Sequence, residues 1–436
     1  MSNTKFIWTA QKSRLPGIPG MIVGCFILLC QAALLPADDW PQINGPQRNG
    51  IASKETLMSD WPKSGLTEVW SHPVGQGYSG PVVVGEKLIV FHRPGKQYLV
   101  EALAAKTGKL IWNKALPSKY SPGGPDPDSG PKCVPLIHDG RIYLLGTGGN
   151  LFCLKLADGE VVWKKNVLEA YDSPSGYFGA GSTPIVINDK LLVNVGGRNA
   201  AVVAFNLKTG AEIWKSFDDR ASYSSPIELK VGGKSQALVV TRLNAVLLDP
   251  DSGRVLSEMK FGKRGATVNG AMPVRVGKYL FLNAAYNVGG RLVNVDDKNQ
   301  LVDVPHDSND QFASQYSTPV VVGDTFYGTA GREDFNNGSF RCVDVSTGKL
   351  KLNWKRERFP VGHTILVGRQ MLTLDSEGGF HVIDANPNKF SRVYQTKLFD
   401  SKSRAMPAIA NGLFYARSNA IRGKGELVCV KVGNSD

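Results

Sequence analysis

The residue types that most often catalyse reactions or bind metals do not occur here in the spacings that such chemistry needs. The His-Glu-x-x-His pattern of helical zinc sites is absent, and so is the Gly-x-Ser-x-Gly pattern of many hydrolases. The histidines stand singly, at His72, His92, His138, His306, His363 and His381. Aspartate pairs such as Asp126 and Asp128 lack EF-hand spacing and are interpreted as turn residues. We therefore predict no metal site and name no catalytic residue.

Arginine and tyrosine recur in a pattern that suits ligand binding. Tyrosines open three short connections, and arginines follow short apolar stretches, with Arg291 in a longer loop of the same series. These candidates are Tyr78, Tyr223, Tyr316, Arg93, Arg198, Arg242, Arg332 and Arg417. Guanidinium groups beside tyrosines suit an anionic or planar ligand, such as a quinone tricarboxylate, an acidic glycan or an acidic protein loop. In the alternative interpretation, the arginines are solvated charges and the tyrosines pack between repeats.

The elements that must position these residues come from an internal repeat. Its clearest unit runs from Ala102 to Trp112 and ends in a glycine turn followed four residues later by tryptophan. It recurs from Cys153 to Trp163 and from Ala204 to Trp214, with weaker copies farther on, where Ser257 replaces the tryptophan and Trp354 is displaced. A proline and a β-branched run open the units, at Pro81, Pro135, Pro184, Pro226, Pro273, Pro319 and Pro407, and one unit near His363 lacks the proline.

Each unit predicts four short antiparallel strands, because apolar residues alternate with period two and glycines mark the turns. Four such strands repeated about every 42–54 residues are typical of a propeller blade. We therefore predict an all-β, eight-bladed propeller of four-stranded antiparallel blades. Seven blades are the alternative, in which the unit at 268–304 is discarded because it lacks the glycine–tryptophan turn. The last unit has no fourth strand, so we expect the N-terminal strand around Trp70 to complete it and close the ring.

Three cysteines share one position of the repeat. Cys153, Cys342 and Cys429 stand where other units have a small alanine, so we expect buried, unpaired thiols. Equivalent strands of separate blades are too far apart for a disulfide. Cys133 lies in the same unit as Cys153, but the second strand should separate the two.

The N-terminal segment predicts export. Residues 1–20 are basic and polar, residues 21–35 are apolar, and the sequence breaks after Ala37, so we predict a signal peptide over 1–37. An uncleaved anchor and a lipid anchor at Cys25 are the alternatives. Residues 38–65 then form a leader, and residues 66–436 form the propeller. We expect no transmembrane domain after cleavage, and a periplasmic, cell-envelope or secreted location in an oxidising compartment.

The basic residues are spread along the chain. The formal net charge is +13, but no stretch has the packed run of lysine and arginine that nucleic-acid arms carry. This distribution favours an anionic partner and argues against nucleic acid.

The Ala-Leu-x-x-x-Thr-Gly-x-x-x-Trp pattern resembles the pyrroloquinoline-quinone-type (PQQ-like) propeller repeat with its tryptophan-docking motif. The segment from Trp40 to Gly50 is similar to the leader of many secreted bacterial proteins of this family, and the build is similar to the eight-bladed outer-membrane assembly lipoprotein. Quinoprotein dehydrogenases of the family commonly carry a disulfide between adjacent cysteines, hold Ca²⁺ with Glu, Asn and Asp, and use an Asp base. This chain has no adjacent cysteines and no segment that matches those motifs.

Two functions are therefore considered. The preferred one is an exported, non-catalytic binding or scaffolding module of the envelope. We expect it to be a monomer without a cofactor, and its partner an envelope protein or an anionic ligand. The alternative is a divergent quinoprotein alcohol or sugar dehydrogenase that uses PQQ and Ca²⁺. The repeat does not decide between them, because one fold supports many functions.

Overall fold

The computed structural model describes residues 39–122, 128–265, 267–305, 311–420 and 424–433. These residues belong to one compact unit, residues 36–436. The signal peptide predicted over 1–37 lies outside the described residues. No helix in the described ranges combines the length and the apolar composition that crossing a bilayer requires.

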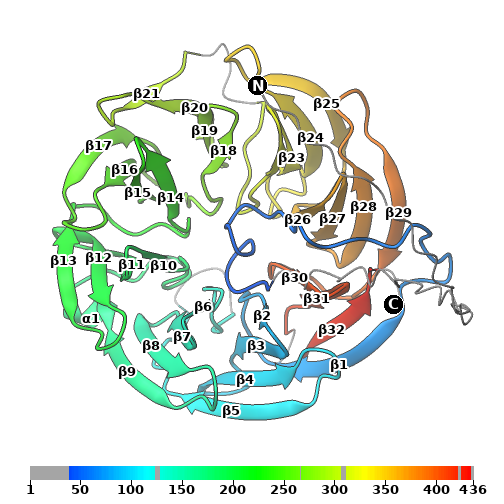
Figure 1. Ribbon diagram of the computed structural model, residues 1–436, viewed down its shortest axis with the longest axis horizontal. Coiled ribbons are helices and arrows are strands. Elements are labelled where there is room, and N and C mark those ends of the chain that lie inside the picture. The colour runs from blue at the N-terminus through cyan, green and yellow to red at the C-terminus, as the bar shows by residue number, and fades with distance from the viewer. Residues whose placement is uncertain (1–38, 123–127, 266, 306–310, 421–423, 434–436) are drawn as a thin grey trace, which may run out of the picture. The chain divides into compact units, whose positions relative to one another are not determined.

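Eight four-stranded antiparallel sheets form the ring of a β-propeller (Figure 1). Blades 1 to 4 consist of β2 (Val82–Val84), β3 (Lys87–His92), β4 (Tyr98–Ala104) and β5 (Leu110–Leu116); β6 (Leu136–His138), β7 (Arg141–Leu145), β8 (Asn150–Lys155) and β9 (Val161–Asn166); β10 (Ile185–Ile187), β11 (Lys190–Gly197), β12 (Ala200–Asn206) and β13 (Glu212–Ser216); and β14 (Ile227–Val231), β15 (Lys234–Val240), β16 (Asn244–Leu248) and β17 (Val255–Lys260).

Blades 5 to 8 follow the same order. They consist of β18 (Val274–Val276), β19 (Tyr279–Ala284), β20 (Gly289–Val295) and β21 (Leu301–Asp303); β22 (Val320–Val322), β23 (Thr325–Ala330), β24 (Ser339–Asp344) and β25 (Lys351–Glu357); β26 (Gly362–Val367), β27 (Gln370–Asp375), β28 (Gly379–Asp384) and β29 (Arg392–Lys397); and β30 (Ala408–Ala410), β31 (Leu413–Arg417), β32 (Gly425–Lys431) and β1 (Glu68–Val74). The one described helix, α1 (Val167–Ala170), is a single turn capped by Asn166.

The ring closes as the sequence predicts. Strand β1 pairs with β32, with Trp70 opposite Cys429 and Val74 opposite Gly425. The unit at 268–304 forms β18 to β21, so the propeller has eight blades rather than seven. Closure pairs the outer edge of β32, which would otherwise be open to another chain.

Tryptophans of the outermost strands join neighbouring blades. The Trp163 indole N–H donates to the Leu207 carbonyl of the next blade at 3.0 Å, and its ring lies where a Cβ on Gly210 would approach to 2.7 Å. Trp70, Trp112 and Trp214 make the same two contacts. Their indoles donate to the carbonyls of Ala105, Leu156 and Pro250, and their rings pack against Gly108, Gly159 and Gly253, respectively. The turn glycine therefore has two reasons to lack a side chain, its positive φ and the indole packed against it.

The small residue of the repeat lies opposite this tryptophan on the adjacent strand. Ala102 pairs with Trp112, Cys153 with Trp163 and Cys342 with Trp354. Trp354, displaced in sequence, is equivalent in space because its turn is longer. All four described cysteines are buried and unpaired, which confirms the prediction of packed free thiols.

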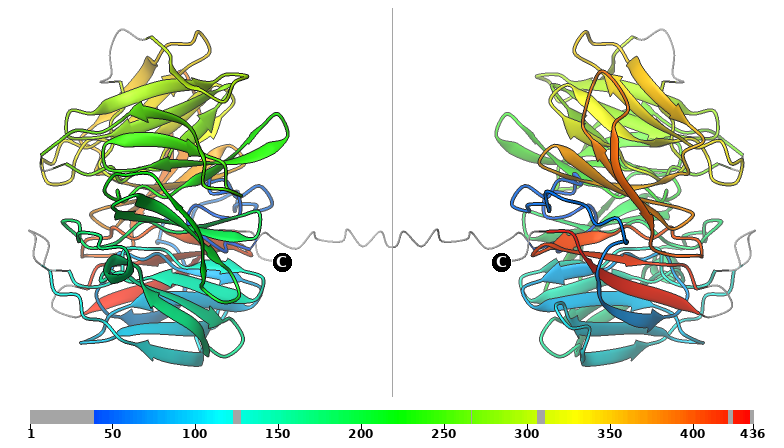
Figure 2. Two further views of the ribbon diagram at one scale, coloured as in Figure 1. Left: turned by 90° about the vertical axis from the view of Figure 1, so that its left-hand side faces the viewer. Right: turned by 90° about the vertical axis from the view of Figure 1, so that its right-hand side faces the viewer.

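The leader runs across the inner strands of the propeller. Trp40 forms a β-bridge with Val83 of blade 1, and Ile51 forms one with Leu366 of blade 7. Between them, the Pro41 carbonyl accepts from Ile137 of blade 2. Figures 1 and 2 show this segment near the middle of the ring and toward one of its faces. The leader contacts the turns between first and second strands, as where Asp39 accepts from Gly85, so it lies on the face opposite the loops described below.

Arg48 anchors the leader to the connection into blade 3. It is 5% exposed, and its Nη1 and Nη2 atoms donate to the carbonyls of Pro184 at 3.0 Å and Thr183 at 3.2 Å. Farther along, the Glu55 carboxylate accepts from the backbone N–H groups of Asn411 and Gly412. The leader thereby contacts blades that are far apart around the ring.

Candidate ligand-binding face

The predicted arginines do not form a uniform ring. Arg417 is fully buried, and its Nη2 donates to the Gly75 carbonyl at 2.6 Å, so it holds the chain after β1. Arg93 is half-buried and donates to the carbonyls of Tyr120 and Ser129. Both side chains stabilise the fold and do not present a free charge.

The other arginines have three different settings. Arg332 pairs with Asp334 and stacks over Tyr286 and Phe335, with its Cζ about 4 Å from each ring centroid. Arg198 is exposed in the turn after β11, and Arg242 lines a pocket. Arg291 was expected in a loop, but it lies within β20, because that strand begins at Gly289 and pairs along its length with β19.

The three predicted tyrosines also lie in different settings. Tyr223 lines the pocket that Arg242 lines, and its hydroxyl accepts from the Phe178 N–H at 2.7 Å. Tyr78 packs beneath the Lys132 ammonium group, 4.1 Å from its ring centroid. The Tyr316 hydroxyl donates to Glu333 at 3.1 Å. Two of these tyrosines therefore belong to polar networks rather than to an open site.

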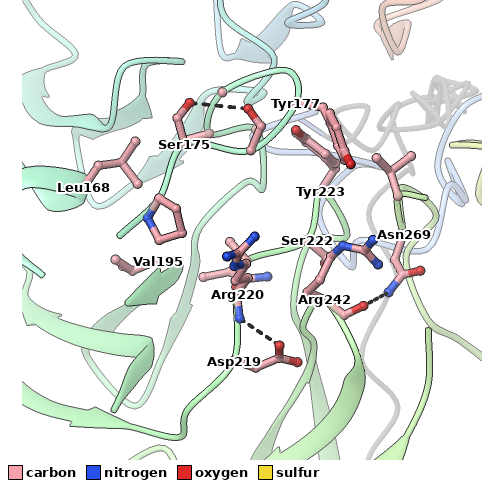
Figure 3. A pocket seen from close by; sticks show the side chains of 18 of the residues that line it. Leu168, Ser175, Tyr177, Val195, Asp219, Arg220, Ser222, Tyr223, Arg242 and Asn269 are labelled. Carbon is pink, nitrogen blue, oxygen red and sulfur yellow. Dashed lines mark hydrogen bonds between the residues drawn. The ribbon is translucent and has the colours of Figure 1, made fainter. Parts of the chain in front are cut away.

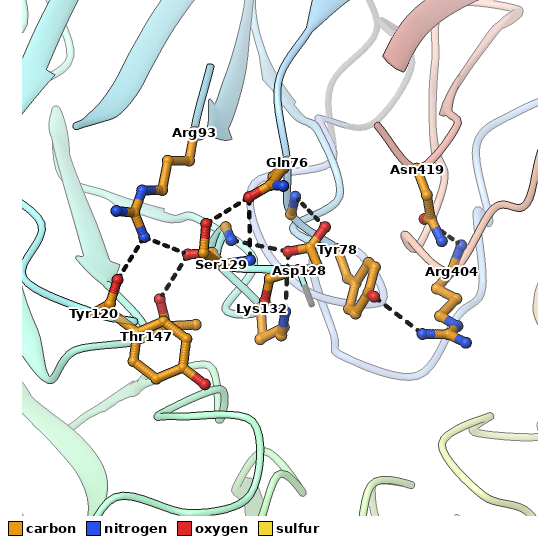
Figure 4. A network of polar contacts seen from close by, with 12 residues as sticks. Gln76, Tyr78, Arg93, Tyr120, Asp128, Ser129, Lys132, Thr147, Arg404 and Asn419 are labelled. Atoms are coloured by element: carbon orange, nitrogen blue, oxygen red, sulfur yellow. Dashed lines mark hydrogen bonds and ion pairs between the residues drawn. The ribbon is translucent and has the colours of Figure 1, made fainter. Parts of the chain in front are cut away.

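One network anchors the ends of the long connection between blades 1 and 2 (Figure 4). The Asp128 carboxylate accepts from the N–H groups of Gly77 and Gly130, at 3.0 and 2.8 Å, and from Lys132 at 3.1 Å. Arg93 holds the same connection through its carbonyl contacts. These bonds fix where Tyr120 and Ser121 stand on the face.

A second network was not anticipated from the sequence. Arg404 and Glu333 form a bidentate ion pair at 2.7 and 3.0 Å, and Arg404 also donates to the Tyr78 hydroxyl. Burial alone would raise the pKa of Glu333, but the hydrogen bonds with Arg404 and Lys402 hold that pKa below its ordinary value. The two residues are far apart in sequence and lie in connections without a motif, so no local signal could have paired them.

A pocket of about 890 Å³ hollows the face over blades 2 to 4 (Figure 3). Its lining comes from α1, from the connections into blades 2 to 5, and from the residues at and after the ends of β7, β11 and β15. These are the connections that the sequence places on one face. The connection 174–181 wraps around Tyr223, because Gly176 and Gly181 leave room for the ring where a Cβ would lie within 2.9 Å.

The pocket is cationic at one end. Its charged lining residues are Arg220, Arg242, Arg264 and Asp219. Asp219 is already satisfied, because it accepts from Thr241, Asn244 and the Leu243 N–H. Arg242 donates to the carbonyls of Lys263 and Gly265, on either side of Arg264. Within the described ranges, no acceptor bonds to the guanidinium of Arg220 or Arg264.

The opposite end of the pocket is apolar. Leu168, which is half-buried, lines it together with the core residues Leu145, Val167 and Val195, which are each only 1% exposed. Figure 3 shows Leu168 and Val195 on the side away from Arg242, with Arg220 between. Tyr177, which is 48% exposed, also lines the pocket and lies beside Tyr223 on the side of Arg242. Sequence reasoning found Arg242 and Tyr223 but missed Arg220 and Arg264, which stand in connections outside the repeated strands.

The residues present do not fit a quinone held by calcium. Such a site needs carboxylate and amide oxygens that converge on one ion. In the part of the chain that the structure describes, no three His, Cys, Asp or Glu side chains lie close enough to hold a metal. Glu333, a carboxylate of these loops whose side chain is 7% exposed, is bonded to Arg404, Lys402 and Tyr316 instead.

The repeats, the eight-bladed ring and the loop face define a PQQ-like repeat propeller. A family model described as outer membrane protein assembly factor BamB matches residues 96–351, more than half of the chain. The chain therefore belongs to this family. It is 27% identical over 360 residues to the outer membrane protein assembly factor BamB of Burkholderia pseudomallei, covering 80% of this chain and 84% of that protein.

Solved structures support the fold. BamB from Moraxella catarrhalis superposes with a TM-score of 0.61 at 15% identity, over 85% of this chain and 99% of that one. A europium-containing methanol dehydrogenase superposes with a TM-score of 0.60 at 13% identity, over 91% and 98% of the two chains. At these identities the likeness shows the fold alone.

Proposed function

We propose that this chain is an exported, non-catalytic propeller that acts as a binding or scaffolding subunit of the cell envelope. The observation that carries the proposal is the pocketed face over blades 2 to 4, whose guanidinium groups at Arg220 and Arg264 have no acceptor in the described part of the fold. Membership of the family described as an outer-membrane protein assembly factor supports a protein partner. The buried networks around Arg93, Arg404 and Asp128 hold the face rigid, which lowers the entropy cost of binding.

The test is to capture a tagged mature chain from the envelope fraction of its own organism, identify the associated protein, and rebuild the complex from purified components. We expect a complex of fixed stoichiometry that contains one copy of the propeller. A chain that elutes alone in the rebuilding experiment, at concentrations well above those in the envelope, would contradict the scaffold function.

The quinoprotein alternative has its own test. Titration of the purified chain with pyrroloquinoline quinone, with and without Ca²⁺, should show no binding, because the described carboxylates do not converge on a metal site. Tight, calcium-dependent binding together with dye-linked oxidation of alcohols or sugars would favour the dehydrogenase instead.

A further inference from the structure

We infer that the pocket over blades 2 to 4 binds an extended acidic segment of a partner protein, in which acidic side chains lie a few residues from aliphatic ones. The inference rests on the proposed function and specifies the chemistry of its partner. It follows from three properties of the pocket: its charge, its two unlike ends and the rigidity of its cationic loop.

The positive charge of the pocket favours an anionic ligand. Three arginines stand against one aspartate, and that aspartate is saturated by internal hydrogen bonds. The side chains of Arg220 and Arg264 are exposed and keep their hydrogen-bond donors for a ligand. A guanidinium binds a carboxylate with two parallel hydrogen bonds, which makes a glutamate or aspartate side chain a suitable partner.

The cationic loop is built to hold its position. Arg242 donates to the carbonyls of Lys263 and Gly265 at 2.8 and 2.7 Å, so it grips the backbone on both sides of Arg264. Asn269 donates in turn to the carbonyls of Thr241 and Arg242. Arg242 is therefore a positioning residue, and Arg264 is the residue that it presents to the ligand.

The apolar end distinguishes a peptide from other anions. Leu168 and Val195 lie across the pocket from Arg242, with Arg220 between them (Figure 3). Val195 is already buried in the core, but Leu168 is only half-buried, and an anionic glycan or a free carboxylate would leave it in contact with water. A peptide that carries both acidic and aliphatic side chains would cover both ends at once, and the pocket of about 890 Å³ has room for several side chains.

The experiment uses the whole mature chain and fluorescein-labelled short peptides in which a pair of glutamates precedes a pair of leucines at varied spacing. Binding is measured by fluorescence anisotropy at low and at moderate salt. Three comparison probes replace the glutamates by lysines, replace the leucines by serines, or substitute a heparin-derived oligosaccharide. We expect the acidic, leucine-containing peptide to bind best and to weaken as salt rises.

Two sets of variants locate the site. The double variant R220E/R264E should weaken the peptide at least tenfold, whereas R275E/R369E, which changes the net charge equally at exposed arginines outside the pocket, should leave it within about twofold. Leu168→Ala, which removes apolar surface without adding charge, should weaken the leucine peptide but not the serine peptide. Thermal unfolding of each variant verifies that the fold persists.

Several outcomes would overturn the inference: equal binding of the lysine peptide, tighter binding of the oligosaccharide than of any peptide, or no effect of R220E/R264E. If the native partner still binds R220E/R264E, the scaffold function stands and only the assignment of the pocket fails. If no partner and no peptide binds the unmodified chain, both proposals fail.

Discussion

Burial gives chemically identical side chains different roles in this propeller. Arg417 ends strand β31, is 0% exposed and is bonded to a carbonyl, whereas Arg264 lies in the connection into blade 5, exposed and unbonded within the described ranges. His363 is a similar case, since it lies 6% exposed beneath Tyr316 with its Nε2 bonded to the Arg404 carbonyl at 3.0 Å. Burial lowers the pKa of His363 to about 4, so this side chain is neutral in the folded protein at neutral pH.

A prediction about acid stability follows for His363. The unfolded chain binds a proton at this residue below about pH 6.5, while the folded chain does so only below about pH 4, so stability is lost as pH falls through this window. Between pH 6.5 and 5 the loss should be about 2 kcal/mol, since one pKa unit corresponds to about 1.4 kcal/mol. His363→Gln should reduce this slope in urea unfolding measured at several pH values.

The control for this series is His138→Gln, at a half-buried position at the end of β6. It should leave the slope unchanged. In His363→Gln the dependence of stability on pH should become weaker but not disappear, because burial also lowers the pKa of His92. The folded structure lowers the pKa of Glu333, so this residue reduces stability only as pH falls below about 4.5. It therefore does not affect the slope measured between pH 6.5 and 5. An unchanged slope in His363→Gln would show that His363 is not buried as described.

At the scale of the element, the turn between the third and fourth strands of one blade contacts the preceding blade and joins the two. A glycine at positive φ, a carbonyl beside it and an indole from the preceding blade recur in blades 1 to 4. At the junction of blades 4 and 5, blade 4 has Ser257 in place of the tryptophan, and its hydroxyl accepts from the Leu301 N–H of blade 5 at 2.9 Å. Polar contact therefore replaces indole packing at that junction.

Gly210→Ala tests this junction. The new Cβ would lie 2.7 Å from the Trp163 ring, in addition to the strain of a φ of 69°. We expect a loss of about 2–4 kcal/mol in the free energy of unfolding. Gly232→Ala is the matched control, because its φ is 56° and nothing lies within 4 Å, so it should cost about 1 kcal/mol. If urea unfolding showed the same loss of free energy for Gly210→Ala and Gly232→Ala, the contact between the new Cβ and the Trp163 ring would contribute nothing to that loss.

At the scale of the whole molecule, two segments from the N-terminal part of the chain hold the ring. Strand β1 completes the last blade, and the leader bridges inner strands of blades that do not touch one another. The leader lies on the face of the turns between first and second strands, whereas the pocket lies among the loops of the other face.

Arg48→Met tests the leader. It removes the donors of the Pro184 and Thr183 carbonyls but keeps most of the side chain's length. We expect a loss of about 2–4 kcal/mol, because buried carbonyls would be left without partners, together with faster proteolysis within 39–57. Lys63→Met, at an exposed position of the same leader, should change neither quantity. A melting temperature for Arg48→Met equal to that of Lys63→Met would show that the leader does not depend on Arg48.

The sequence by itself determined the blades, their number, the closing strand and the buried cysteines. These features are local or periodic: a glycine turn, a period-two alternation and a small residue opposite a tryptophan can each be recognised within a few tens of residues. The path of the leader and the roles of the arginines were decided only in three dimensions. Arg404 forms an ion pair with Glu333, 71 residues away in the sequence, and Arg220 and Arg264 line one pocket although they belong to separate connections. The physical reason is that a strand is specified by its neighbours in sequence, whereas the burial and partners of a loop side chain depend on which distant loops the closed ring brings beside it.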